Sequence, residues 1–188
     1  MDIIYNYINN ELNNASTLTG GPLRQVMGEL VENMIDLIWQ EMQKKYPNVN
    51  SKMTVGKKTP IKITNKGGSI EESVDRHGFI NGKMVIGIEC KTYLDKCYLQ
   101  RADSDFSLMK EGADFEAIIV SLENAVSDNA FNFFMNRNNI DNVFYLADGK
   151  RKSGIDNHIS HNIERINKEK IAILVDKIEG YFKEAANV

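Results

Sequence analysis

Two side chains of opposite charge stand at the end of an apolar run. In MVIGIECK (84–91), Glu89 and Lys91 are separated only by Cys90. Because successive side chains of a β-strand point to opposite faces, a strand here turns Glu89 and Lys91 to one face and Cys90, together with Met84, to the other. Cys90 then packs in the core as a small hydrophobic residue. Glu89 and Lys91 form either a surface ion pair, which contributes about 0–1 kcal/mol, or part of a catalytic site.

A second carboxylate favours the catalytic interpretation. Asp75 precedes Glu89 in a hairpin that we predict over residues 69–91, with its turn at Asn81-Gly82. Two carboxylates on neighbouring strands can chelate a hard divalent cation such as Mg²⁺. The cation would neutralise a scissile phosphate and acidify a water molecule, while Lys91 orients that water or stabilises the developing charge. The three side chains therefore have a chemical reason to lie together.

The register of the hairpin decides which acid shares a face with Glu89. A two-residue turn places Asp75 opposite Ile88, on the wrong face, and makes Glu72 the acid on the Glu89 face. A three-residue loop, or a bulge at Gly78, returns Asp75 to that face. We favour Asp75 and keep Glu72 as its alternative.

Helix and strand patterns alternate around this hairpin. Apolar residues at helical spacing predict a helix over residues 22–46, with a second helix capped by Asp103 or Ser104. Further along the chain we predict a buried strand over 115–123, a helix over 127–137, a strand over 142–148 and a helix over 163–182. This order predicts an α/β fold with a mixed central sheet flanked by helices.

The composition suits a single domain. The chain has 188 residues, of which 42% are hydrophobic and 26% charged. We divide it into an N-terminal segment (1–21), a core (22–148), and a basic loop with a C-terminal helix (149–188). It has no apolar run long enough to span a membrane, no secretory leader and only two cysteines, so we expect a cytoplasmic prokaryotic protein without a membrane partner.

Basic residues are gathered in particular segments, although the net charge is −3. They are typical of solvated loops, but beside a phosphate-directed site they would bind the DNA backbone. The candidates for phosphate contacts are Lys57, Lys58, Lys62, Lys66, Lys150, Arg151 and Lys152. The candidates for contacts to base edges in the major groove are Lys96, Gln100 and Arg101.

The SVD sequence at 73–75, followed by the hairpin and IECK at 88–91, resembles the signature of the PD-(D/E)xK nucleases. The order of helix, three strands, helix and strand resembles the core of that superfamily, and a short single-domain chain is most similar to the type II restriction endonucleases. The resemblance implies that Asp75 and Glu89 are metal ligands and that Lys91 is the catalytic lysine. It also implies a further acid from the first helix, for which Glu29 is our candidate. Val74 stands where the family often has proline.

The resemblance implies Mg²⁺-dependent hydrolysis of double-stranded DNA at a short, palindromic site, with Mn²⁺ able to replace Mg²⁺. A two-fold DNA site is most simply read by a two-fold protein, so we expect a homodimer with one active site per subunit. Two alternatives remain: a structure-selective nuclease, such as a Holliday-junction resolvase or a repair nuclease, and a non-catalytic α/β interaction domain in which Glu89 and Lys91 form a structural ion pair.

Overall fold

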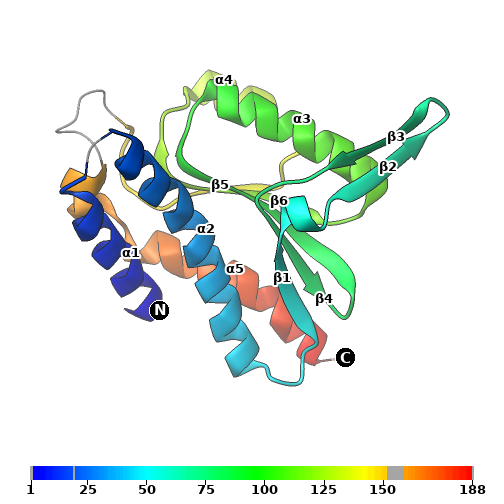
Figure 1. Ribbon diagram of the computed structural model, residues 1–188, viewed down its shortest axis with the longest axis horizontal. Coiled ribbons are helices and arrows are strands. Elements are labelled where there is room, and N and C mark those ends of the chain that lie inside the picture. Colours follow the sequence, from blue (N-terminus) through cyan, green and yellow to red (C-terminus); the bar gives the residue numbers. More distant parts are fainter. Residues whose placement is uncertain (1, 19, 152–158, 188) are drawn as a thin grey trace.

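The computed structural model describes residues 2–18, 20–151 and 159–187 (Figure 1). The helices are α1 (Asp2–Ala15), α2 (Gly20–Lys45), α3 (Lys96–Gly112), α4 (Asp128–Met135) and α5 (Lys168–Ala186). The strands are β1 (Ser51–Val55), β2 (Ile61–Asn65), β3 (Gly68–Glu72), β4 (Arg76–Ile80), β5 (Lys83–Leu94), β6 (Glu116–Asn124) and β7 (Asn142–Tyr145). Short 3₁₀ turns lie at η1 (Gly56–Lys58), η3 (Ile159–His161) and η4 (Ile163–Arg165).

The central sheet is mixed, as the sequence predicts. Its strands follow the order β1-β4-β5-β6-β7, in which β1, β4 and β5 pair antiparallel and β5, β6 and β7 pair parallel. Strands β2 and β3 form a separate two-stranded arm that extends away from the sheet (Figure 1). The predicted α/β class with flanking helices is therefore confirmed.

The helices cover the two faces of the sheet. On one face, α1, α2 and α5 pack in an apolar core that includes Ile86, Ile88 and Cys90 of β5. On the other face, α3 and α4 pack in a second core that includes Ala117 and Ile119 of β6. Figure 1 shows these two groups of helices on opposite sides of the strands. Because side chains alternate along β5, residues 89 and 91 point toward the α3 side, as predicted.

The hairpin between β4 and β5 contains both a two-residue turn and a bulge. Ile80 pairs with Lys83 across the turn, but Gly78 pairs with Ile86, so the register shifts by one residue and Val85 of β5 has no partner. Arg76 then lies opposite Ile88, and continuing this register places Asp75 opposite Glu89. In the part of β5 before the bulge, the side chains therefore point to the opposite faces from those that simple alternation predicts. Met84 therefore lies in the second core, and its predicted place beside Cys90 is wrong.

Two segments contain more regular structure than the sequence analysis predicted. The N-terminal segment 1–21 includes α1, whose Ile4, Ile8 and Leu12 are buried against α2. The lysine-rich segment 51–68 contains β1, η1 and β2, and the predicted strand before Asn81 is divided into β3 and β4. Strand β2 and the arm it forms rest on α3, where a methyl group added to Gly112 would lie 2.8 Å from the Ile61 side chain.

Helix α3 begins before the predicted cap. Asp95 is the N-cap, since its carboxylate accepts a hydrogen bond from the Tyr98 backbone amide at 2.9 Å. The predicted cap Asp103 lies inside the helix, buried, where it pairs with Arg137 and accepts from Asn139. The three candidates for base contacts, Lys96, Gln100 and Arg101, therefore lie in the first half of a helix.

None of the helices described in the structure is both long and apolar enough to cross a membrane.

Candidate active site

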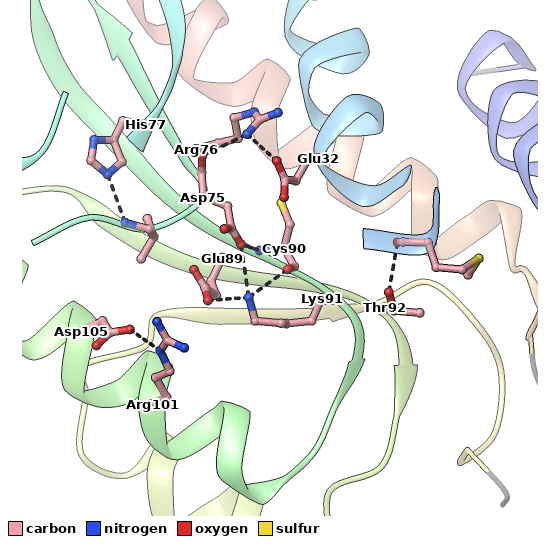
Figure 2. A network of polar contacts seen from close by, with 12 residues as sticks. Glu32, Asp75, Arg76, His77, Glu89, Cys90, Lys91, Thr92, Arg101 and Asp105 are labelled. Atoms are coloured by element: carbon pink, nitrogen blue, oxygen red, sulfur yellow. Dashed lines mark hydrogen bonds and ion pairs between the residues drawn. The ribbon is translucent and has the colours of Figure 1, made fainter. Parts of the chain in front are cut away.

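Asp75, Glu89 and Lys91 lie together at the middle of the sheet (Figure 2). The Lys91 ammonium nitrogen is 2.5 Å from Glu89 Oε1 and 3.2 Å from Asp75 Oδ2, and it donates to the Cys90 carbonyl at 3.0 Å. One cationic atom thus contacts oxygens from two consecutive residues of β5, Glu89 and Cys90, and from Asp75 directly before β4. When both acids are ionised they carry two negative charges and Lys91 one positive charge, which leaves the group with a net charge of −1.

The backbone around Asp75 is fixed from two directions. The Cys90 amide donates to Asp75 Oδ2 at 2.8 Å, so the carboxylate is held against β5. The Gly56 amide of η1 donates to the Asp75 carbonyl at 3.1 Å. The buried His77 ring holds the same region together, because Nδ1 lies 3.1 Å from the Thr59 carbonyl and Nε2 accepts from the Val74 amide at 3.4 Å. These contacts orient a carboxylate that lies outside any regular strand.

Helix α2 supports the site through Arg76, not through Glu29. The buried Arg76 guanidinium donates two hydrogen bonds to Asp36, at 2.8 and 2.9 Å, and one to Glu32 at 2.8 Å. Burial lowers the pKa of Arg76, but the two carboxylates raise it more, and the net shift is upward. Glu29 is exposed and accepts from Gln25 on its own helix. Helix α2 therefore does bring acids toward the sheet, but they are Glu32 and Asp36, one and two turns beyond the predicted Glu29.

Burial dominates the electrostatics of the acid and lysine pair. Glu89 is 7% exposed, and burial together with the Asp75 charge raises its pKa to about 7 against the opposing effect of Lys91. Burial alone lowers the pKa of Lys91, but Glu89 and Asp75 raise it, and the net shift is upward. An additional positive charge at this position would stabilise the ionised form of Glu89.

The donors at this site fit a hard divalent cation in chemical type. Asp75, Glu89 and the Cys90 carbonyl already converge on the Lys91 ammonium, which shows that their oxygens can face one cation. Within the described residues there is no group of three or more His, Cys, Asp or Glu side chains that could hold a metal. Two carboxylates completed by water are the usual protein contribution to a Mg²⁺ site. The residues therefore suit Mg²⁺ better than a metal that needs nitrogen or sulfur ligands.

Helix α3 forms a second wall of the site, and of its residues there only Arg101 was named from the sequence, as a candidate DNA contact. Arg101 and Asp105 lie on the Lys91 side of the cluster in Figure 2, 3.5 Å apart, and the Asp105 charge contributes to the raised pKa of Glu89. Burial and the charge of Glu72 raise the pKa of Asp105 itself. Tyr98, one turn before Arg101, has its ring 5.9 Å from the Lys91 nitrogen. The spacing of these three residues could have indicated a helix face, had the helix been predicted to begin at residue 96.

The alternative first acid, Glu72, ends β3 and accepts a hydrogen bond from the Ser73 amide. It forms no hydrogen bond or ion pair with Lys91, and its negative charge raises the pKa of Asp105. The geometry therefore groups Asp75, not Glu72, with Glu89 and Lys91.

The predicted DNA contacts are divided among several surfaces. Lys57, Lys58, Lys62 and Lys66 are exposed on η1 and the β2–β3 arm. Lys96 and Gln100 line a groove with Phe133 and Arg137 of the α4 region. Lys150 pairs with Asp128 at 2.9 Å, and Arg151 lies over the Tyr93 ring. Lys152 lies outside the described residues.

The mixed five-stranded sheet flanked by helices is compatible with a restriction-endonuclease-like α/β fold. No protein-family model matches the chain. The chain is 53% identical over 38 residues to "Type II restriction enzyme DdeI" of Desulfomicrobium norvegicum, a match that spans 20% of this chain and 16% of that enzyme. The similarity to a type II restriction enzyme is thus local, and it covers far less than two thirds of either protein.

Proposed function

We propose that this chain is a type II restriction endonuclease that hydrolyses phosphodiester bonds of double-stranded DNA at a short, palindromic site in the presence of Mg²⁺. The observation that carries the proposal is the convergence of Asp75 and Glu89 on Lys91, on the sheet face walled by α3. The local similarity to a type II restriction enzyme supports the same substrate class.

In this proposal Asp75 and Glu89 hold the cation and Lys91 serves the attacking water. A bound Mg²⁺ would supply positive charge against the scissile phosphate and lower the pKa of a water molecule. Lys91 carries a proton at neutral pH, since its pKa is raised. Its ammonium can therefore donate to a phosphate oxygen or orient a water molecule for attack. The Cys90 amide and η1 keep Asp75 in place for this role.

The test is digestion of plasmid DNA of known sequence with purified protein, with Mg²⁺, with Mn²⁺ and with a chelator. We expect discrete fragments with defined ends in either metal and none with the chelator. Lys91→Ala should lose cleavage, whereas Lys83→Ala should keep it, because Lys83 is an exposed cation at the opposite end of β5. Cleavage of branched DNA alone would support a resolvase. No cleavage by the unchanged protein would support the third alternative, a non-catalytic interaction domain.

We also infer a homodimer on the DNA, because a palindromic site has two equivalent strands and each chain carries one group of Asp75, Glu89 and Lys91. Light scattering on the protein with a DNA duplex that carries the mapped cleavage site, without added metal, should give two chains per duplex. One chain per duplex, with nicked products, would contradict this assembly.

A further inference from the structure

Two aromatic rings lead from the Lys91 ammonium to a second cation, the Arg151 guanidinium. The Lys91 nitrogen lies 5.9 Å from the centroid of the Tyr98 ring. Tyr98 packs edge to face on Tyr93, with 5.6 Å between centroids and 71° between planes. The Arg151 guanidinium lies over the Tyr93 ring at 3.7 Å from its centroid. These side chains come from β5, from the first turn of α3 and from the segment after β7, so the row is a product of the fold.

Arg151 is held in place, and its positive charge is only partly balanced by the neighbouring Glu123 carboxylate. Its backbone amide donates to the Asn124 carbonyl at 2.7 Å, which attaches the segment to the end of β6. The buried Glu123 lies opposite Tyr93 in the β5–β6 pairing, and its Oε1 accepts from Arg165 at 2.8 Å. The Arg151 Nε is 3.9 Å from Glu123 Oε2, beyond hydrogen-bond distance. Two guanidinium groups thus share one carboxylate, and the excess positive charge lies at Arg151, whose side chain is 31% exposed.

The contact on Tyr93 orients this charge. An arginine stacked on an aromatic ring is attracted by the face of the ring and keeps its N–H donors at its edge, where they can bind an anion. Since Arg151 covers one face of Tyr93 and Tyr98 packs on the same ring, Tyr93 is better suited to hold the guanidinium than to stack a base. Tyr98 is the more exposed ring, at 36%, and its hydroxyl can donate to a phosphate oxygen.

The row also has a suitable length. Lys91 and Tyr93 share a face of β5, and two residues of a strand span about 6.6 Å. A DNA strand advances about 3.4 Å per nucleotide along the helix axis. For DNA whose axis runs along β5, Arg151 above Tyr93 is therefore about two nucleotides along that axis from a phosphate that lies at Lys91.

We propose that Arg151, Tyr93 and Tyr98 form a binding site for the DNA backbone beside the scissile phosphate, in which Arg151 contacts the phosphate about two nucleotides away and Tyr93 and Glu123 position its guanidinium. This inference rests on the proposed nuclease function. It names a contact that the arrangement of Asp75, Glu89 and Lys91 does not require. The contact adds affinity at a fixed place on the strand and carries no sequence information.

The experiment uses duplexes that carry the mapped cleavage site, each with one phosphate replaced by an uncharged methylphosphonate. Binding is measured by fluorescence anisotropy without added metal, over a range of salt concentrations. For the unchanged protein we expect one neutralised phosphate, within about two nucleotides of the cut, to weaken binding. For Arg151→Gln that position should lose its effect, and the slope of log K against log salt should fall by about 1.

Two further variants separate binding from a merely structural role. Arg151→Lys keeps the charge but loses the planar fork, so it should restore the slope while binding more weakly than the unchanged protein. Lys83→Gln, which removes an exposed cation from the far end of β5, should leave both the slope and the methylphosphonate pattern unchanged. Thermal unfolding of each variant checks that it is folded.

The two proposals fail differently. If plasmid DNA is not cut, the nuclease function falls and this inference falls with it. If DNA is cut but Arg151→Gln and Arg151→Lys both keep the phosphate pattern and salt slope of the unchanged protein, Arg151 only anchors its own segment and the inference alone is wrong.

Discussion

Lys91 is the residue on which the site depends. Its ammonium faces two carboxylates that would otherwise repel each other, and it leaves the group with one net negative charge. Lys91 thus keeps the two acids from being unpaired in a largely buried place. The Arg76 guanidinium likewise pairs with two carboxylates, those of Glu32 and Asp36 on α2.

At this scale the identity of the first acid can be tested directly. Asp75→Asn keeps the size of the side chain and an oxygen for the Cys90 amide, but removes the charge beside Lys91. We expect it to lower the cleavage rate by about 10²-fold or more, the usual order for losing one preorganised electrostatic group. Glu72→Gln and Glu29→Gln are matched controls, since neither acid contacts Lys91. An equal loss in Glu72→Gln would make Glu72 the first acid.

Among the elements, the short turn η1 has the closest connection to the site. A methyl group added to Gly56 would lie 1.8 Å from the Val74 carbonyl oxygen, directly before Asp75. Only a residue without a side chain lets η1 approach this closely and donate its amide to Asp75. The turn and the lysines it carries are therefore fixed to Asp75.

Gly56→Ala should displace Asp75 and lower both stability and cleavage. Gly28→Ala is its control, because a methyl group there meets nothing within 4 Å, and alanine favours a helix over glycine by about 1 kcal/mol. We expect thermal unfolding to show a lower Tm for the first variant and a rise of about 2–4 °C for the second. A Gly56→Ala protein with unchanged Tm and activity would show that η1 does not position the acid.

The elements also show which patterns the sequence could reveal. Strands β5 to β7 and helices α2, α4 and α5 have clear periodicity, and they were predicted close to their places. The β2–β3 arm is exposed on most of its surface, so it lacks the alternation that identifies a strand. Helix α3 follows β5 after Asp95 alone, with no glycine or proline to mark the change. Missing that boundary is the reason Tyr98 and Asp105 were not predicted beside Lys91.

The spacing of Glu89 and Lys91 in the sequence predicts that they share a face of the strand, but it does not predict which residues they contact. Glu89 and Lys91 share a face through simple alternation, whereas the place of Asp75 depends on the register of the hairpin. The sequence left a three-residue loop and a bulge at Gly78 as alternatives, and the structure has the two-residue turn with a register shift between Gly78 and Phe79. The stacking of Arg151 on Tyr93 joins residues from distant parts of the chain, and a single sequence holds no pattern for such a contact.

For the whole molecule, the helices on one face are tied together by a buried acid. Glu179 of α5 accepts from Lys45 and Tyr46 at the end of α2, at 2.6 and 2.5 Å. These hydrogen bonds lower the pKa of Glu179 to about 2, from an ordinary value of 4.5. Since the folded chain releases this proton more readily than the unfolded chain, the contribution to stability is complete above about pH 4.5 and is lost as the pH falls toward 2.

Glu179→Gln should therefore flatten the dependence of Tm on pH. Near pH 7 we expect a Tm lower by about 2–4 °C, as for a loss of about 1 kcal/mol, and the difference should shrink as the pH falls below 4.5. Calorimetry from pH 7 to pH 3 measures both quantities. Glu169→Gln, an acid in the first turn of the same helix, is the control. A constant difference at every pH would mean that the lost interaction is not one of charge.

The bulge at Val85 has a consequence for the length of the hairpin. A two-residue turn followed by regular pairing places an even number of residues between two facing positions, but Asp75 and Glu89 are separated by an odd number. Val85 is the residue that makes this number odd. Between the turn and the acids, β5 is therefore one residue longer than β4, and the bulge accommodates the extra residue. Deletion of Val85 alone would give a regular two-residue hairpin in which Asp75 still lies opposite Glu89, so what the site requires is the pairing of these two positions.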